Sequence, residues 1–159
     1  MLQGDVGSGK TLVALAAMLT AVESGAQAAL LAPTEVLARQ HHASLSALLQ
    51  PLQIEVGLLL GQGRTSAQKP DASQQNQAEP PPTQRSRKAT LAAMADGTLS
   101  LVVGTHALLS DTAVFKDLGV AVIDEQHRFG VRQRILLGEK GRNVDVMVMT
   151  ATPIPRSLA

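Results

Sequence analysis

Short apolar runs separated by helical patterns constrain the fold of this chain most strongly. Helical patterns occur at residues 10–24, 36–49 and 87–95. Runs of strand length predict five strands, at residues 28–32, 54–60, 99–104, 119–124 and 144–150. Four of the five are continuously apolar rather than alternating, which is typical of strands buried on both faces. The alternation of strands and helices predicts an α/β fold, with one parallel sheet flanked by helices.

The composition narrows the class of protein. A length of 159 residues fits one domain, and 45% apolar residues with a net charge of +1 are ordinary for a globular chain. With two Phe, no Tyr and no Trp, the chain lacks aromatic platforms on which bases stack, so any nucleic-acid contact must use backbone amides, hydroxyls, Arg or Lys. We also expect Met and Phe to supply the bulky core side chains.

Other absences bear on the compartment. The chain has no Cys, which excludes disulfides, thiolate metal sites and a Cys nucleophile, and favours the cytosol. No run approaches the roughly 18 apolar residues of a membrane span, and the first residues lack the features of a signal peptide. The expectation is a cytoplasmic protein without a membrane partner.

Residues 61–86 depart from the pattern because they are rich in Gln, Pro and Ser and carry little to bury. We interpret this segment as a disordered, low-complexity insertion on the surface of the domain. An arm that contacts a protein or a nucleic-acid strand is the alternative, and its basic residues would be Arg64, Lys69, Arg85, Arg87 and Lys88.

The segment GDVGSGKT at residues 4–11 matches G-x-x-x-x-G-K-[ST] at every fixed position. Glycines allow a loop to wrap phosphates with its backbone N–H groups, and a following helix N-terminus favours their charge. Lys10 would reach the β- and γ-phosphates, and the Thr11 hydroxyl would bind Mg²⁺. The predicted nucleotide-binding residues are Gly4, Gly7, Ser8, Gly9, Lys10 and Thr11.

The run VAVIDE at residues 120–125 predicts a buried strand that ends in two carboxylates. Ligands of open α/β sheets bind at the carboxyl ends of the strands. Asp124 would hold Mg²⁺, and Glu125 would orient or deprotonate the attacking water. Acids also finish strands at the solvent boundary, so the assignment depends on the phosphate loop upstream.

Small polar side chains follow three other predicted strands. Thr34 follows the strand at 28–32, the turn Gly104-Thr105-His106 follows the strand at 99–104, and Thr150 and Thr152 follow the last strand. Taken alone, Thr34 and Thr105 are also explained by a structural role, as a helix cap or as part of a turn. The adjacent histidines at positions 41 and 42, inside a predicted helix, are interpreted as solvated or as lying at the edge of the core.

In this order, the segments GDVGSGKT, APTEVLARQH, GTHALL, VIDEQHRFGV and MTATPIPRSLA resemble the first RecA-like motor domain of superfamily 2 helicases, most closely the RecG type. DEQHRFGV with TATPIPR is specific to that type and to its relative, the Mfd transcription-repair coupling translocase. Gln126 followed by His127 favours the RecG type, because the Mfd type has a second Glu in place of this Gln. The resemblance covers nearly the whole chain apart from the insertion.

The resemblance implies a role for each matched residue. Lys10, Glu125, Gln126 and His127 would be catalytic, and Asp124 would organise Mg²⁺ beside the bound ATP. Gln126 and His127 would couple the γ-phosphate to Thr150 and Thr152. The residues that would hold the sugar-phosphate backbone of DNA are Thr34, Gly104, Thr105 and His106.

The resemblance also implies further parts. Such helicases act on branched or forked DNA, and they need a second RecA-like domain, which supplies arginine fingers, and a wedge domain. Only three residues precede Gly4, so residues 1–159 are interpreted as a partial, N-terminally truncated motor domain that is nearly inactive alone. Alternatives are the motor of an Mfd-type translocase, a nucleotide-dependent interaction module that does not hydrolyse ATP, and, least consistent with the motifs, a small-molecule kinase.

Overall fold

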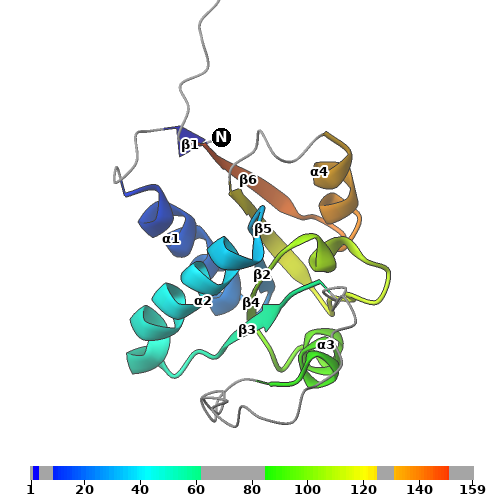
Figure 1. Cartoon of the computed structure of the whole chain (residues 1–159), viewed down its shortest axis with the longest axis horizontal. Helices are drawn as coiled ribbons and strands as arrows, with labels where there is room; N and C mark the ends of the chain where they lie inside the picture. Colours follow the sequence, from blue (N-terminus) through cyan, green and yellow to red (C-terminus); the bar gives the residue numbers. More distant parts are fainter. Residues whose placement is uncertain (1, 4–8, 62–84, 125–130, 151–159) are drawn as a thin grey trace, which may run out of the picture.

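A single parallel sheet forms the centre of the protein (Figure 1). The computed structural model describes residues 2–3, 9–61, 85–124 and 131–150. Within these residues the sheet has six strands in the order β1-β6-β5-β2-β4-β3, and every pair is parallel. The strands are β1 (Leu2–Gln3), β2 (Gln27–Leu31), β3 (Val56–Leu59), β4 (Leu101–Gly104), β5 (Leu118–Asp124) and β6 (Asp145–Thr150).

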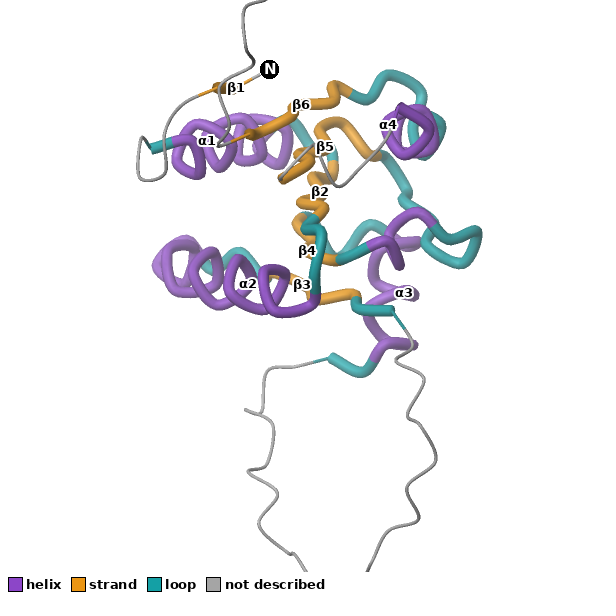
Figure 2. The backbone as a smooth tube through the Cα atoms, turned by 45° about the horizontal axis from the view of Figure 1, so that its top comes forward, coloured by secondary structure: helices purple, strands orange, loops and turns teal. Residues whose placement is uncertain are grey.

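Helices cover both faces of the sheet, as Figure 2 shows with the strands viewed nearly end-on. On one face lie α1 (Lys10–Glu23) and α2 (Glu35–Leu49), and on the other lie α3 (Arg87–Asp96) and α4 (Val131–Gly138). The short 3₁₀ helices η1 (Gln50–Leu52) and η2 (His106–Leu109) follow α2 and β4. The α/β class, the parallel sheet and its flanking helices are therefore confirmed, and each predicted strand and helix lies within two residues of its observed bounds.

Local chemistry sets the helix ends. The Ser86 hydroxyl caps α3 by accepting a hydrogen bond of 3.2 Å from the Ala89 N–H. Gly97 ends the same helix with a φ of 83°, a left-handed conformation that glycine adopts without strain. Gly25, with a φ of 88°, serves the same purpose just after α1.

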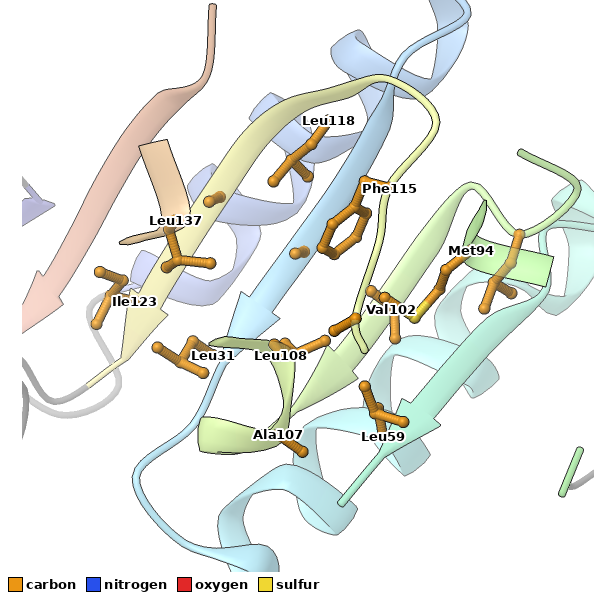
Figure 3. Packing of buried hydrophobic residues seen from close by; sticks show 14 of the residues in the cluster. Leu31, Leu59, Met94, Val102, Ala107, Leu108, Phe115, Leu118, Ile123 and Leu137 are labelled. Carbon is orange, nitrogen blue, oxygen red and sulfur yellow. The ribbon is translucent and has the colours of Figure 1, made fainter. Parts of the chain in front are cut away.

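The core has two layers, one on each face of the sheet. In the layer beneath α3 and α4, Phe115, Leu118 and Leu137 converge from different segments of the chain (Figure 3). The layer beneath α1 and α2 contains Met18, Leu45 and Met149. Most of the largest fully buried side chains in the described residues are leucines, so the expectation that Met and Phe would fill the core holds only in part.

The Gln- and Pro-rich segment lies in the sequence between β3, at one edge of the sheet, and α3. Strand β3 ends at Leu59, and the chain is described again from Arg85, just before α3. Residues 62–84 lie outside the described part, so disorder in the predicted insertion stays a prediction. No helix within the described ranges is long and apolar enough to cross a membrane.

Gln27 joins three segments in the interior. Its side-chain amide donates to the carbonyls of Met94 at 2.9 Å and Leu99 at 2.8 Å, and its oxygen accepts from the Asp117 N–H at 2.9 Å. Gln27 is 3% exposed, and its hydrogen bonds to the Met94 and Leu99 carbonyls are buried. The amide thus fixes the approaches to β4 and β5 against the end of α3.

Substituting Gln27→Leu is expected to lower the free energy of unfolding by about 2 kcal/mol, because the Leu99 carbonyl and the Asp117 N–H lose their side-chain partner and an unsatisfied buried group costs about 1–3 kcal/mol. The Met94 carbonyl keeps its hydrogen bond from the Lys116 N–H. Urea unfolding followed by circular dichroism measures the change. The exposed Gln40 provides the control, and Gln40→Leu should change the free energy of unfolding by less than about 0.5 kcal/mol. Equal losses in both variants would contradict a structural role for the Gln27 amide.

Candidate nucleotide-binding site

The first part of the site is the junction between β1 and α1. Strand β1 ends at Gln3 and α1 begins at Lys10, so the G-x-x-x-x-G-K-[ST] segment joins a strand to a helix, as this motif requires. Gly9 caps α1 with a φ of 79°, where a side chain would be strained. Gly4, Gly7 and Ser8 lie outside the described residues, and Thr11 is exposed in the first turn of the helix.

Lys10 reaches across the site to the last strand. Its ammonium donates a hydrogen bond of 3.2 Å to the backbone carbonyl of Thr150 at the end of β6. Strand β1 pairs with β6 in parallel, with Gln3 opposite Thr150, so the two strands end at the same edge of the sheet. The structure therefore brings Lys10 and Thr150, which are 140 residues apart, into direct contact.

Asp124 ends β5, the neighbour of β6. Side chains alternate along β5: Ala121 and Ile123 pack beneath α3 and α4, whereas Val122 packs beneath α1 and α2. By this alternation the Asp124 carboxylate lies on the face that α1 and α2 cover, and it contacts His41 of α2 there. Asp124 and Lys10 thus lie at the same edge of the sheet, on the face that α1 and α2 cover.

The donor set is suited to Mg²⁺. One carboxylate, from Asp124, and one hydroxyl, from Thr11, are the hard oxygen donors that this ion takes when phosphates and water complete its shell. Among the described residues there is no group of three or more His, Cys, Asp or Glu that could enclose a metal ion.

The remaining catalytic and coupling residues of the sequence-based prediction are only partly visible. Thr150 is buried at the end of β6. Glu125, Gln126, His127 and Thr152 lie outside the described residues, and their roles stay predictions.

The predicted DNA contact Thr34 has a structural role in the protein. Its hydroxyl caps α2 by accepting a hydrogen bond of 3.2 Å from the Leu37 N–H, which is one of the two interpretations open from the sequence. The residue is exposed at the carboxyl edge of the sheet. A helix cap and a phosphate contact are compatible, because the hydroxyl can donate one hydrogen bond while accepting another.

The second predicted DNA contact is the turn after β4. Thr105 is 2% exposed, and its N–H donates a hydrogen bond of 3.2 Å to the Leu59 carbonyl. His106 is exposed at the start of η2, and its ring lies close to Gly61. A contact between this turn and DNA would thus be made by His106 rather than by the buried Thr105 side chain.

Gly104 has a steric reason to be glycine. A Cβ at this position would clash with the Leu59 carbonyl and approach the Leu108 side chain to 2.9 Å. Replacing it with alanine is expected to cost about 1–3 kcal/mol of stability, because the β3–β4 pair must separate. Thermal unfolding tests this, with Gly138→Ala as the control, since nothing lies within 4 Å of a Cβ there. A Gly104→Ala variant as stable as Gly138→Ala would contradict the expected clash.

The two histidines of α2 make specific polar contacts. His41 Nε2 lies 2.7 Å from Asp124 Oδ2, and His42 Nε2 donates to the Val56 carbonyl at 2.9 Å. Both residues are half-buried, as expected for the edge of the core, but sequence reasoning missed the link from His41 to the site. One signal was present: His41 lies three residues after Ala38 and four before Leu45, the spacing of an inward helical stripe.

Two basic side chains close to the end of the Gln- and Pro-rich segment form hydrogen bonds with residues that flank β3. Arg85 makes two hydrogen bonds, of 2.6 and 2.8 Å, to the Glu55 carboxylate, which lower the pKa of Glu55 and raise the pKa of Arg85. Arg87 donates to the Leu60 carbonyl. Together with Arg39 and His42 they line a cavity of about 230 Å³ beside β3.

Comparison with known proteins identifies the family. The model of the DEAD/DEAH box helicase family matches residues 1–159. The chain belongs to the DEAD/DEAH box helicase family. Within it, the chain is 52% identical over its full length to the ATP-dependent DNA helicase RecG of Acidithiobacillus ferridurans and 47% identical to that of Bacillus subtilis. These identities confirm the resemblance to RecG-type helicases.

The relatives are much longer than this chain, which spans 20% of the length of both RecG proteins. Among solved structures, RecG bound to a three-way DNA junction matches with a TM-score of 0.72 and 40% identity over 99% of this chain and 18% of that one. A structure of Dbp5 from S. cerevisiae bound to RNA and ADP BeF3 matches over 96% of this chain and 36% of that one, with a TM-score of 0.62. At 22% identity, the Dbp5 match shows the fold alone.

Proposed function

We propose that this chain is the ATP-binding half of a helicase motor, the first RecA-like domain of a protein that couples ATP hydrolysis to translocation on branched DNA and to its remodelling. One observation carries the proposal: the Lys10 ammonium and the Asp124 carboxylate lie at the edge where the G-x-x-x-x-G-K-[ST] segment joins β1 to α1. This combination suits a nucleotide triphosphate with its metal ion. The RecG identities supply the class of reaction.

Each residue has a proposed task. Backbone N–H groups of the loop and of the α1 N-terminus bind the phosphates, and the Lys10 ammonium moves from the Thr150 carbonyl to the β- and γ-phosphate oxygens. Asp124 and Thr11 hold Mg²⁺, which when bound neutralises developing phosphate charge. Glu125 orients the attacking water, and Gln126 and His127 relay the γ-phosphate state toward Thr150 and Thr152.

The proposed partners are branched DNA and further domains of a longer protein. The solved RecG holds a three-way DNA junction, and this chain would contribute part of such a grip through phosphates. Thr34 and His106 are exposed on the loops that follow β2 and β4 at the carboxyl edge of the sheet, where a backbone could run. A second RecA-like domain and a wedge domain would complete the machine, and the chain matches about a fifth of the length of its relatives.

A chimera tests this function. We would replace the matching fifth of Acidithiobacillus ferridurans RecG with this chain and measure phosphate release with and without forked DNA. The chimera should hydrolyse ATP in response to the DNA, and Glu125→Gln should lose hydrolysis while keeping ATP binding. A chimera that binds ATP and forked DNA without hydrolysis, or that is unaffected by Glu125→Gln, would instead favour an interaction module that does not hydrolyse ATP.

A further inference from the structure

His41 makes a contact that the proposed function does not use. Its Nε2 atom lies 2.7 Å from Asp124 Oδ2, although the two residues are 83 positions apart and belong to α2 and β5. The side chains of His41 and Asp124 are only 17% and 16% exposed. The bond is therefore short, polar and largely shielded from solvent.

The packing of α2 holds the imidazole in place. Ala38 and Leu45 flank His41 on the same helical stripe and are fully buried beneath α2. Because the alternation of β5 directs Asp124 toward this face, the His41 ring and the Asp124 carboxylate meet between α2 and the end of β5. A carboxylate can only accept hydrogen bonds, so the imidazole Nε2 is the donor.

The neighbouring histidine shows what a purely structural contact looks like. His42 donates to the Val56 carbonyl at 2.9 Å and so attaches α2 to β3. Ala38, Leu45 and Leu49 bury the same helix against the sheet. With α2 already anchored in these ways, the His41 bond contributes mainly to the orientation of one carboxylate.

We infer that His41 is a positioning residue for the metal-binding carboxylate: it holds Asp124 Oδ2, fixes the rotation of the carboxyl group and leaves Oδ1 to face Mg²⁺. The inference rests on the proposed function, in which Asp124 binds the ion. Partners that orient a metal ligand change metal affinity by about 10- to 100-fold when they are removed. His41 touches neither nucleotide nor metal in this proposal and acts only through Asp124.

The test separates the loss of the hydrogen-bond donor at position 41 from a change in side-chain shape. Gln places its amide nitrogen near the position of imidazole Nε2, so His41→Gln keeps a donor that reaches Asp124 Oδ2. Asn is polar but too short, and Leu fills space without a donor. His42→Gln is the matched control, because it alters the adjacent histidine and the contact with Val56 rather than with Asp124.

The measurement is Mg²⁺-dependent binding of a non-hydrolysable ATP analogue to the 159-residue chain, by titration calorimetry at a series of Mg²⁺ concentrations. For His41→Leu and His41→Asn, we expect the Mg²⁺ concentration that gives half of the maximal nucleotide binding to rise about 10- to 100-fold. The affinity for the nucleotide without metal should not change. His41→Gln and His42→Gln should remain within about threefold of the original chain. If the Leu variant fails to fold, the Asn and Gln pair still decides the question.

The outcomes distinguish this inference from the function beneath it. Unchanged Mg²⁺ dependence in His41→Asn, an equal rise in His41→Gln, or an equal rise in His42→Gln would overturn the positioning role alone. If the original chain binds no nucleotide, or if Lys10→Ala binds it equally well, the proposed function fails and the inference fails with it.

Discussion

ATP hydrolysis by the 159-residue chain alone is expected to stay near background, even with saturating forked DNA. The proposed function implies that arginine fingers from a second RecA-like domain complete the ATP site, and this chain spans about a fifth of the length of its RecG relatives. By analogy with GTPases that lack their finger, the rate should be roughly 10³ to 10⁵ lower than that of a complete motor. The effect is large because finger cations stabilise charge that develops only in the transition state.

Phosphate release measures this difference directly, with the chimera described above as the complete motor for comparison. Turnover should appear in the chimera and stay at the buffer rate for the chain alone. Robust, DNA-stimulated hydrolysis by the purified chain would contradict the requirement for a second domain. Loss of the chimera's turnover in Glu125→Gln would exclude a contaminating ATPase as its source.

The fold was predictable because two local features of the sequence identify its strands: their apolar composition and the turns or helix caps at their ends. Strands β2 and β4 are buried along their whole length, and apart from Gln27 at the start of β2 they contain only apolar residues and glycine. Turns or helix caps bound both strands. Gly97 and Ser86 mark the ends of α3 in the same local way. Such signals lie within a few residues of each other, where sequence patterns are most informative.

Helix α4 was not predicted because it lacks such local signals. Of its eight residues, Val131–Gly138, only Leu137 is buried, so the helix has no apolar stripe of the usual width. Its position follows from tertiary packing rather than from its own pattern. Strand β1, with two residues, is too short for any pattern and takes its conformation from pairing with β6.

The same distinction between local signals and long-range contacts applies to the candidate site. Lys10 and Asp124 could be chosen from the sequence because a motif and a strand end mark them locally. The contacts of Lys10 with Thr150 and of His41 with Asp124 span 140 and 83 positions, and they depend on a strand order that no local pattern contains. Thr34 precedes the helix predicted at residues 36–49 and His41 lies within it, yet only the cap at Thr34 could be anticipated, because a cap depends on neighbouring residues alone.

Lys10→Ala is the second change with a large expected effect. The ammonium is the cation that the structure places between α1 and the end of β6, where the phosphates of the proposed nucleotide would lie. Removing one partner of a buried, hydrogen-bonded charge pair costs about 2–5 kcal/mol, or roughly 30-fold to a few thousand-fold in affinity. At ordinary nucleotide concentrations, binding that is already weak without a second domain should become undetectable.

Titration calorimetry of Mg²⁺-ATP into the original chain, Lys10→Ala and Lys88→Ala tests the central claim most directly. Lys88 is an exposed lysine of α3, on the face opposite α1, so its loss controls for charge and for helix content. We predict measurable binding by the original chain and by Lys88→Ala, and none by Lys10→Ala. Equal binding by all three proteins, or no binding by the original chain, would contradict an ATP site at this edge of the sheet.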